Sequence, residues 1–424
     1  MIKNYKWLLL LSLGLVACSN DDDAVTEEPI AVTSGEADFS NFVALGNSLT
    51  AGFTDGALFK AAQMQSMPNL MAQKFALAGG GEFPQPLMSD NTGGLLFGGN
   101  PLPGFGPRLF FNGSGIATLP GTPTTDITSN PAGPFNNLGV PGAKSFHLLA
   151  PGYGNAAGLL TAPPTANPYF VRMASNPATS VIADAVAQNP TFFQLWIGNN
   201  DVLGYALSGG DGTNPITDTP TFTFAYTTLI TQLTSGGAKG VVANIPDVTS
   251  IPHFTTVPFN PVPLDAATTA TLNTIFGALN QIYAAIGQPN RSVVFSSTQT
   301  NAVVIRDESL ANISATITGA LNANPNFPLF VQQLGLPAAA APLVAQLLGS
   351  TYGQTRQATA DDLLVLPSSS VIGTVNTNFM NFLMSQGLSQ QLAAQFSVEG
   401  VTFPLDDKWV LLPSEQQEIA TATN

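Results

Sequence analysis

Short apolar segments that alternate with stretches of helical spacing constrain the fold of this chain more than any other feature. The expected strands are residues 42–46, 191–197, 239–245 and 292–296, and the expected helices are 66–77, 179–188, 221–233 and 265–286. Strands that alternate with helices favour a parallel sheet with helices on both faces. The sequence therefore predicts an α/β fold, a three-layer sandwich around a mostly parallel sheet of about five strands.

Two long segments interrupt this alternation. Residues 79–134 are rich in Gly, Pro and Asn and are expected to form long ordered loops. A second insertion covers about 299–400, where the apolar stretch 310–348 is cut by Pro328, Pro337 and Pro342 into short helices. This helical insertion either forms a lid or acyl-binding wall, or is a packing feature without a functional role.

The N-terminal segment has the features of an export signal. Lys3 and Lys6 precede the apolar run 7–15, which is too short to span a bilayer and therefore indicates a signal peptide. The single cysteine, Cys18, follows Leu-Val-Ala, and this sequence resembles a bacterial lipobox. The resemblance implies that residues 1–18 are a lipoprotein signal peptide. It also implies that a lipidated Cys18 anchors the protein to the outer membrane or the cell surface.

Residues 19–37 are acidic and are expected to form a solvated tether ahead of a domain that covers 38–424. The acidic run after Cys18 resembles surface-export signals of Bacteroidetes lipoproteins, and a plain linker explains it equally well. The whole chain has 12 basic and 26 acidic residues, a net charge of −14. A nucleic-acid partner would need a basic face, and the sequence shows none.

Three polar loops carry the residues with chemical potential. The first contains Ser48 directly after strand 42–46, the second is the glycine-rich segment 137–143, and the third contains Asn200 directly after strand 191–197. The carboxyl ends of parallel strands meet at one edge of a sheet, where such folds bind ligands. A serine hydroxyl, exposed backbone N–H groups and an asparagine amide at that edge would suit nucleophilic attack with stabilisation of an oxyanion.

Taken together, these loops resemble the first three sequence blocks of the SGNH/GDSL hydrolases, in the same order. The resemblance covers residues 42–297 discontinuously and includes Asn244-Ile245-Pro246, which is similar to an Asn-Leu-Pro stretch of that family. It implies a flavodoxin-like fold and an esterase or lipase. Ser48 would be the nucleophile, with the N–H groups of Ser48 and Gly142 and the amide of Asn200 as oxyanion donors. The family's usual Asp before the serine is Asn47 here, a change that we do not expect to alter the chemistry.

The resemblance lacks the family's catalytic base, a histidine three residues after an aspartate near the C-terminus. The chain has two histidines, His147 and His253, and neither lies in such a motif. In one interpretation the motif follows Asn424, after a helix that begins with Ser414 as its N-cap. In a second, His253 substitutes as the base with Asp247 as its partner, while His147 is structural.

In a third interpretation the protein is a non-catalytic surface lipoprotein that binds lipid or glycan on a degenerate fold. For an active enzyme, the expected substrate is a small-molecule or lipid ester, and an acetylated glycan is the alternative. No His, Cys and carboxylate cluster with ligand spacing is present in the sequence, so no metal or organic cofactor is expected.

Overall fold

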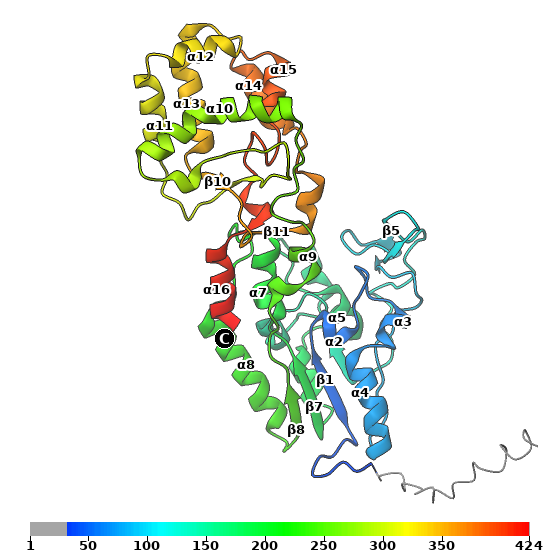
Figure 1. Ribbon diagram of the computed structural model, residues 1–424. Coiled ribbons are helices and arrows are strands. Elements are labelled where there is room, and N and C mark those ends of the chain that lie inside the picture. Colours follow the sequence, from blue (N-terminus) through cyan, green and yellow to red (C-terminus); the bar gives the residue numbers. More distant parts are fainter. Residues whose placement is uncertain (1–31, 424) are drawn as a thin grey trace, which may run out of the picture.

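The computed structural model describes residues 32–423 (Figure 1). The expected signal peptide, the lipidation site Cys18 and most of the expected tether lie outside the described residues. Among those residues, no single helix is long and apolar enough to cross a membrane. One pair, Phe327–Gln333 and Ala338–Tyr352, reaches that length and composition only when joined across a bend of 116°.

The central sheet has four parallel strands. Their order is β6 (Asn137–Gly139), β1 (Phe42–Gly46), β7 (Phe192–Trp196) and β8 (Lys239–Val242). Gly46 at the end of β1 pairs with Gly139 of β6 and with Trp196 of β7, so the three strands end at the same level. All five residues of β1 are buried, as a central parallel strand requires. The expectation of an α/β fold with a parallel sheet is confirmed.

Helices cover both faces of this sheet. On one face, Phe42 and Phe192 pack with Phe75 of α4 (Met67–Phe75), and Phe75 stacks on Phe39 with ring centroids 3.9 Å apart. On the other face, Val43 and Leu195 pack against apolar side chains of α6 (Val181–Val186) and α8 (Thr219–Thr234). Alternate residues of each strand therefore serve two separate apolar layers.

Strand β8 forms one edge of the sheet and is open to solvent. It pairs with β7 alone among the residues that the structure describes, and all four of its residues are exposed. Val241 and Val242 are 44% and 46% exposed, and Phe224 of the neighbouring α8 is 70% exposed. The edge thus carries apolar side chains and one free row of backbone hydrogen-bonding groups.

The prediction of a strand at 292–296 is wrong. The fourth strand of the sheet is β6, which lies in segment 137–143 that was expected to be a loop. Residues 292–296 lie along α10 (Ala266–Ala285). Asn280 of that helix accepts a hydrogen bond from Val293 N at 2.9 Å and donates one to Val293 O at 2.8 Å. Asn273 makes the same pair of bonds with Phe295, at 2.9 Å each. These side chains satisfy backbone groups that would otherwise need a neighbouring strand.

A second core lies beyond the carboxyl edge of the sheet, at the top of Figure 1. Its helices are α10, α11 (Ser314–Ala323), α12 (Phe327–Gln333), α13 (Ala341–Tyr352), α14 (Thr377–Ser385) and α15 (Gln390–Gln395). The buried cluster extends from Val257 to Leu412, so α10 belongs to it and not to the layers of the sheet. We call this part of the molecule the helical unit.

Four short two-stranded sheets lie outside the central sheet. The loop region 79–134 contains two hairpins, β2 (Leu96–Phe97) with β3 (Asn100–Pro101) and β4 (Leu109–Phe111) with β5 (Ile116–Thr118). At the base of the helical unit, β9 (Val304–Arg306) pairs with β10 (Thr355–Gln357), and β11 (Leu363–Leu364) pairs with β12 (Val410–Leu411).

Replacement of Asn280 by Ala should destabilise the helical unit. The change leaves the N–H and C=O of Val293 without their partner, at a cost of about 1–3 kcal/mol in the free energy of unfolding. Urea unfolding followed by circular dichroism measures this cost. Gln281→Ala on the exposed face of the same helix is the matched control. Equal stability of the two variants would contradict this account of segment 292–296.

Candidate active site

The three polar loops meet at the carboxyl edge of the sheet, where each is hydrogen-bonded to the other two. Val140 N donates to Gly46 O at 2.9 Å, Asn47 Nδ2 donates to Asn199 Oδ1 at 3.1 Å, and Asn200 Nδ2 donates to Ala143 O at 2.8 Å. Segments about 50 to 150 residues apart in the chain therefore form one connected site. We call these segments the serine loop (46–48), the glycine loop (139–143) and the asparagine loop (198–201).

The serine loop is a tight turn from β1 into the short helix α2 (Ser48–Ala51). Asn47 is 1% exposed and caps this helix, because its Oδ1 accepts a hydrogen bond from Leu49 N at 3.0 Å. A Cβ atom at Gly46 would lie 2.1 Å from Thr50 Oγ1, so only glycine fits there. Ser48 is partly exposed, and its hydroxyl has no hydrogen-bond partner in residues 32–423.

Donor groups are available beside the serine. Gly142 has a φ of +80° with open space where a Cβ would lie, so its backbone conformation, and not crowding, favours glycine. The N–H groups of Gly142 and Ser48 donate to no acceptor in the described part of the chain. The Asn200 amide uses one hydrogen on Ala143 O, which leaves its second hydrogen for another acceptor.

Asp201 fixes the segment that follows the glycine loop, and the sequence did not predict this role. Its carboxylate is 2% exposed and accepts hydrogen bonds from Ser145 N at 2.8 Å and from Ser145 Oγ at 2.7 Å. The asparagine loop opens α7 (Asn199–Leu207), so the rigid start of this helix holds both Asn200 and Asp201. The sequence shows only an aspartate directly after Asn200, and its partner Ser145 lies 56 residues away.

His147 contacts the segment after the glycine loop and an aromatic ring. Its Nδ1 accepts a hydrogen bond from Lys144 N at 3.0 Å, and its ring stacks on Tyr153 with centroids 4.9 Å apart. Burial lowers the pKa of His147, and the nearby charge of Asp201 opposes this effect only in part. A neutral imidazole that accepts a backbone hydrogen bond braces the turn after the glycine loop.

His253, the proposed substitute base, is hydrogen-bonded neither to Ser48 nor to Asp247 in the described part of the chain. His253 lies on the short helix α9 (Pro252–Thr255), where its Nε2 is buried without a hydrogen-bond partner and burial lowers its pKa. Asp247 instead caps the turn Val248–Ser250 by accepting hydrogen bonds from Thr249 N and Oγ1 at 2.9 and 2.7 Å. Among the described residues no hydrogen bond joins His253 to Asp247, or either of them to Ser48.

The last helix, α16 (Pro413–Thr423), begins two residues earlier than expected. The predicted N-cap Ser414 is wrong, because Pro413 already occupies the first turn and Gln416 N donates to Leu412 O. Glu415 reaches back so that its Oε2 accepts a hydrogen bond from Leu412 N at 2.6 Å. In a capping box the side chain of the third helical residue accepts a hydrogen bond from the N-cap N–H, and Glu415 makes this bond with Leu412.

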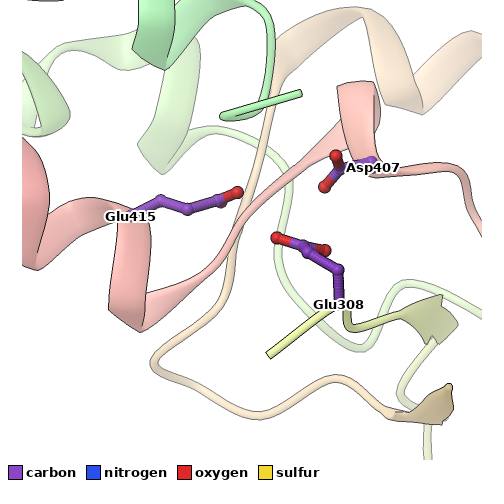
Figure 2. A group of neighbouring side chains, drawn as sticks. All are labelled: Glu308, Asp407 and Glu415. Atoms are coloured by element: carbon purple, nitrogen blue, oxygen red, sulfur yellow. The ribbon is translucent and has the colours of Figure 1, made fainter. Parts of the chain in front are cut away.

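The same Glu415 belongs to a cluster of three carboxyl groups, with Glu308 and Asp407 (Figure 2). One oxygen from each lies within 4.8 Å of the others. Within residues 32–423 this is the group whose geometry could hold a metal ion, and carboxylate oxygens are the ligands that hard cations prefer. The three residues come from distant segments, so local spacing in the sequence gave no sign of them.

Burial and mutual repulsion keep protons on this carboxyl cluster. Burial, followed by the neighbouring Glu308 and Asp407, raises the pKa of Glu415 to about 9. Burial and Glu308 likewise raise the pKa of Asp407 to about 7, with a smaller contribution from Asp211. Like charges at such short range cannot all be ionised, because each disfavours the charged form of the others. The cluster therefore holds protons near neutral pH that ordinary carboxyl groups release.

Stability should fall with rising pH because of these groups. Their folded-state pKa values are raised, so their contribution is complete below about pH 4 and is lost as the pH rises through about 7 and then about 9. Glu415→Gln removes one titration, and we expect it to reduce by about half the decrease in Tm between about pH 5 and pH 9. Calorimetry with EDTA present measures this decrease, with the exposed Glu82→Gln as control. An unchanged pH dependence in Glu415→Gln would refute the assignment.

Replacement of Asn47 by Ala should loosen the site as a whole. It removes the cap on Leu49 N and the bond to Asn199, at a cost of about 1–3 kcal/mol in the free energy of unfolding. Asn47→Asp keeps the cap, and a rotated Asn199 amide can donate to the new carboxylate, so this variant should stay close to the wild-type Tm. Differential scanning calorimetry of both variants tests the difference. A larger loss in Asn47→Asp than in Asn47→Ala would contradict it.

Comparisons with protein-family models, with curated proteins and with solved structures find no match to this chain.

Proposed function

We propose that this protein is a serine ester hydrolase with a three-layer SGNH-type α/β fold. The observation that carries the proposal is the hydrogen-bonded convergence of the serine, glycine and asparagine loops at one sheet edge. An accessible hydroxyl lies on one loop, and unused N–H donors lie on the same loop and on the two others. Such an arrangement suits acyl transfer, because the donors can stabilise charge on the carbonyl oxygen of a substrate.

In the proposed reaction, Ser48 Oγ attacks the ester carbonyl carbon and the carbonyl oxygen becomes negatively charged. The N–H groups of Ser48 and Gly142 and the free hydrogen of the Asn200 amide donate to this oxyanion. The C–O bond to the alcohol then breaks, and the alcohol leaves with a proton. Water attacks the resulting acyl-serine, releases the carboxylic acid and returns the proton to Ser48.

The reaction needs a base to take the Ser48 proton, and within residues 32–423 no hydrogen bond joins His147 or His253 to Ser48. We propose that the base belongs to a further Asp-x-x-His segment, and the open edge of β8 supports this proposal. A strand added in parallel beside β8 would end at the same edge of the sheet as Ser48. A loop after such a strand could bring a histidine towards the serine hydroxyl, with its aspartate as the orienting partner.

A non-catalytic protein that binds lipid or glycan at the same edge is the second candidate. The observation that favours it is the Ser48 hydroxyl, which has no hydrogen-bonded base in the described residues. In either case we propose an exported lipoprotein held to the outer membrane or cell surface through Cys18. For the enzyme, we propose small-molecule or lipid esters as substrates, with acetylated glycans as the alternative.

A fluorophosphonate probe should label Ser48 in the protein produced from its own reading frame. Ser48→Ala should abolish labelling, whereas Ser235→Ala on the exposed end of α8 should keep it. Asn200→Ala should lower kcat for p-nitrophenyl butyrate by about 100- to 1,000-fold, the usual loss for one oxyanion donor. The absence of both labelling and turnover in the wild type would refute the hydrolase and support the binding protein.

A further inference from the structure

Two neighbouring side chains at the start of α7 hold the chain directly after Gly142. Asn200 Nδ2 donates a hydrogen bond to Ala143 O at 2.8 Å. The Asp201 carboxylate accepts hydrogen bonds from Ser145 N at 2.8 Å and from Ser145 Oγ at 2.7 Å. Ala143 and Ser145 are both 0% exposed, so the protein shields these bonds from water. The first turn of α7 therefore carries one proposed oxyanion donor and also fixes the segment that carries another.

The direction of the Gly142 N–H depends on these fixed points. Before Gly142 the loop is held at Val140, whose N–H donates to Gly46 O at 2.9 Å and whose carbonyl accepts a hydrogen bond from Ala143 N at 3.1 Å. Gly142 itself has a φ of +80° and open space where a Cβ would lie. Its N–H donates to no acceptor within residues 32–423. No hydrogen bond of its own therefore sets the direction of this N–H, and the contacts before and after it must do so.

The Asp201 carboxylate serves only the segment after Gly142. It is 2% exposed, each of its oxygens accepts one hydrogen bond from Ser145, and it forms no ion pair with any residue that the structure describes. Burial of a carboxylate without a cation is costly. The two bonds from Ser145 and the positive end of α7, in whose first turn Asp201 lies, offset this cost. Because both oxygens are occupied, Asp201 has none left for a substrate or for the Ser48 proton.

We propose that Asp201 is a positioning residue of the active site, which keeps the Gly142 N–H directed at the oxyanion by fixing Ser145. This inference rests on the proposed hydrolase function. An oxyanion donor is effective only within a narrow range of distances and directions. A loosened glycine loop therefore lowers kcat more than it weakens binding of the substrate. Because Asn200 and Asp201 are neighbours on one rigid helical turn, they hold two of the oxyanion donors in a fixed relation to each other.

Steady-state kinetics with p-nitrophenyl butyrate, on the protein produced from its own reading frame, test the proposal. Ser145→Ala removes one of the two bonds and should lower kcat about tenfold, with KM changed by less than about threefold. Asp201→Ala removes both bonds and should lower kcat about 100-fold. Asp201→Asn should restore kcat to within about threefold of the wild type, because its amide can accept from Ser145 N and donate to Ser145 Oγ.

A second aspartate provides the matched control. Asp184 accepts the same pair of hydrogen bonds, from Ser175 N at 3.0 Å and from Ser175 Oγ at 2.6 Å, outside the three loops. Asp184→Ala should therefore leave kcat within about twofold of the wild type. A loss in this control as large as in Asp201→Ala would overturn the proposal, because the effect would then follow general destabilisation. Wild-type kcat in Ser145→Ala would also overturn it, and this conservative variant decides the matter if Asp201→Ala does not fold.

Two further outcomes separate this inference from its alternatives. If Asp201→Asn loses as much activity as Asp201→Ala, the negative charge and not the hydrogen bonds is required, and the positioning role is refuted. Hydrogen exchange, which needs no activity, should be faster at residues 139–145 in Asp201→Ala than in the wild type and unchanged there in Asp184→Ala. Unchanged exchange in Asp201→Ala would overturn the proposal. A wild type without turnover would refute the hydrolase itself and this inference with it, whereas an active wild type with active Asp201→Ala refutes the positioning role alone.

Discussion

The common level at which β6, β1 and β7 end is the constraint on which the candidate site depends. Parallel pairing sets Gly46 beside Gly139 and Trp196, so the loops that follow must leave the sheet together. The Asn47–Asn199 bond and the Asn200–Ala143 bond then fix the loops to one another. Both bonds use amide side chains, and among residues 32–423 no ion pair joins these loops, which accords with a chain in which only 9% of residues are charged.

Elements with a continuous apolar run were predictable from the sequence, and those defined by partners were not. Strands β1 and β7 and the long helices α8 and α10 lie within a few residues of their predicted bounds. Strand β6 was missed because its three residues include Asn and Gly, which signal a turn, and only its pairing with β1 makes it a strand. Residues 292–296 were predicted to be a strand and are not one, because two asparagines of α10 form the hydrogen bonds that a neighbouring strand would form.

For the candidate site, the sequence indicated which loops carry the polar groups but not how they are held. The three loops were predicted from their positions after apolar segments or from their glycine content, and the roles of Ser48, Gly142 and Asn200 came from the family resemblance. The support from Asp201 on Ser145, and the separation of His253 from Asp247, depend on side-chain directions that no local pattern encodes. The carboxyl cluster was equally hidden, since it forms only where the helical unit returns to the sheet.

That return is made by α16, whose Glu418 accepts a hydrogen bond from the hydroxyl of Tyr205 on α7 at 2.8 Å. In the same helix, Glu415 accepts a hydrogen bond from Leu412 N and also belongs to the carboxyl cluster. A single side chain thus links the ionisation state of the junction between the two units to the first turn of a helix. When a proton leaves this carboxyl group, the new charge repels its acidic neighbours while the backbone N–H attracts it. The first turn of α16 is therefore coupled to the protonation of the carboxyl cluster.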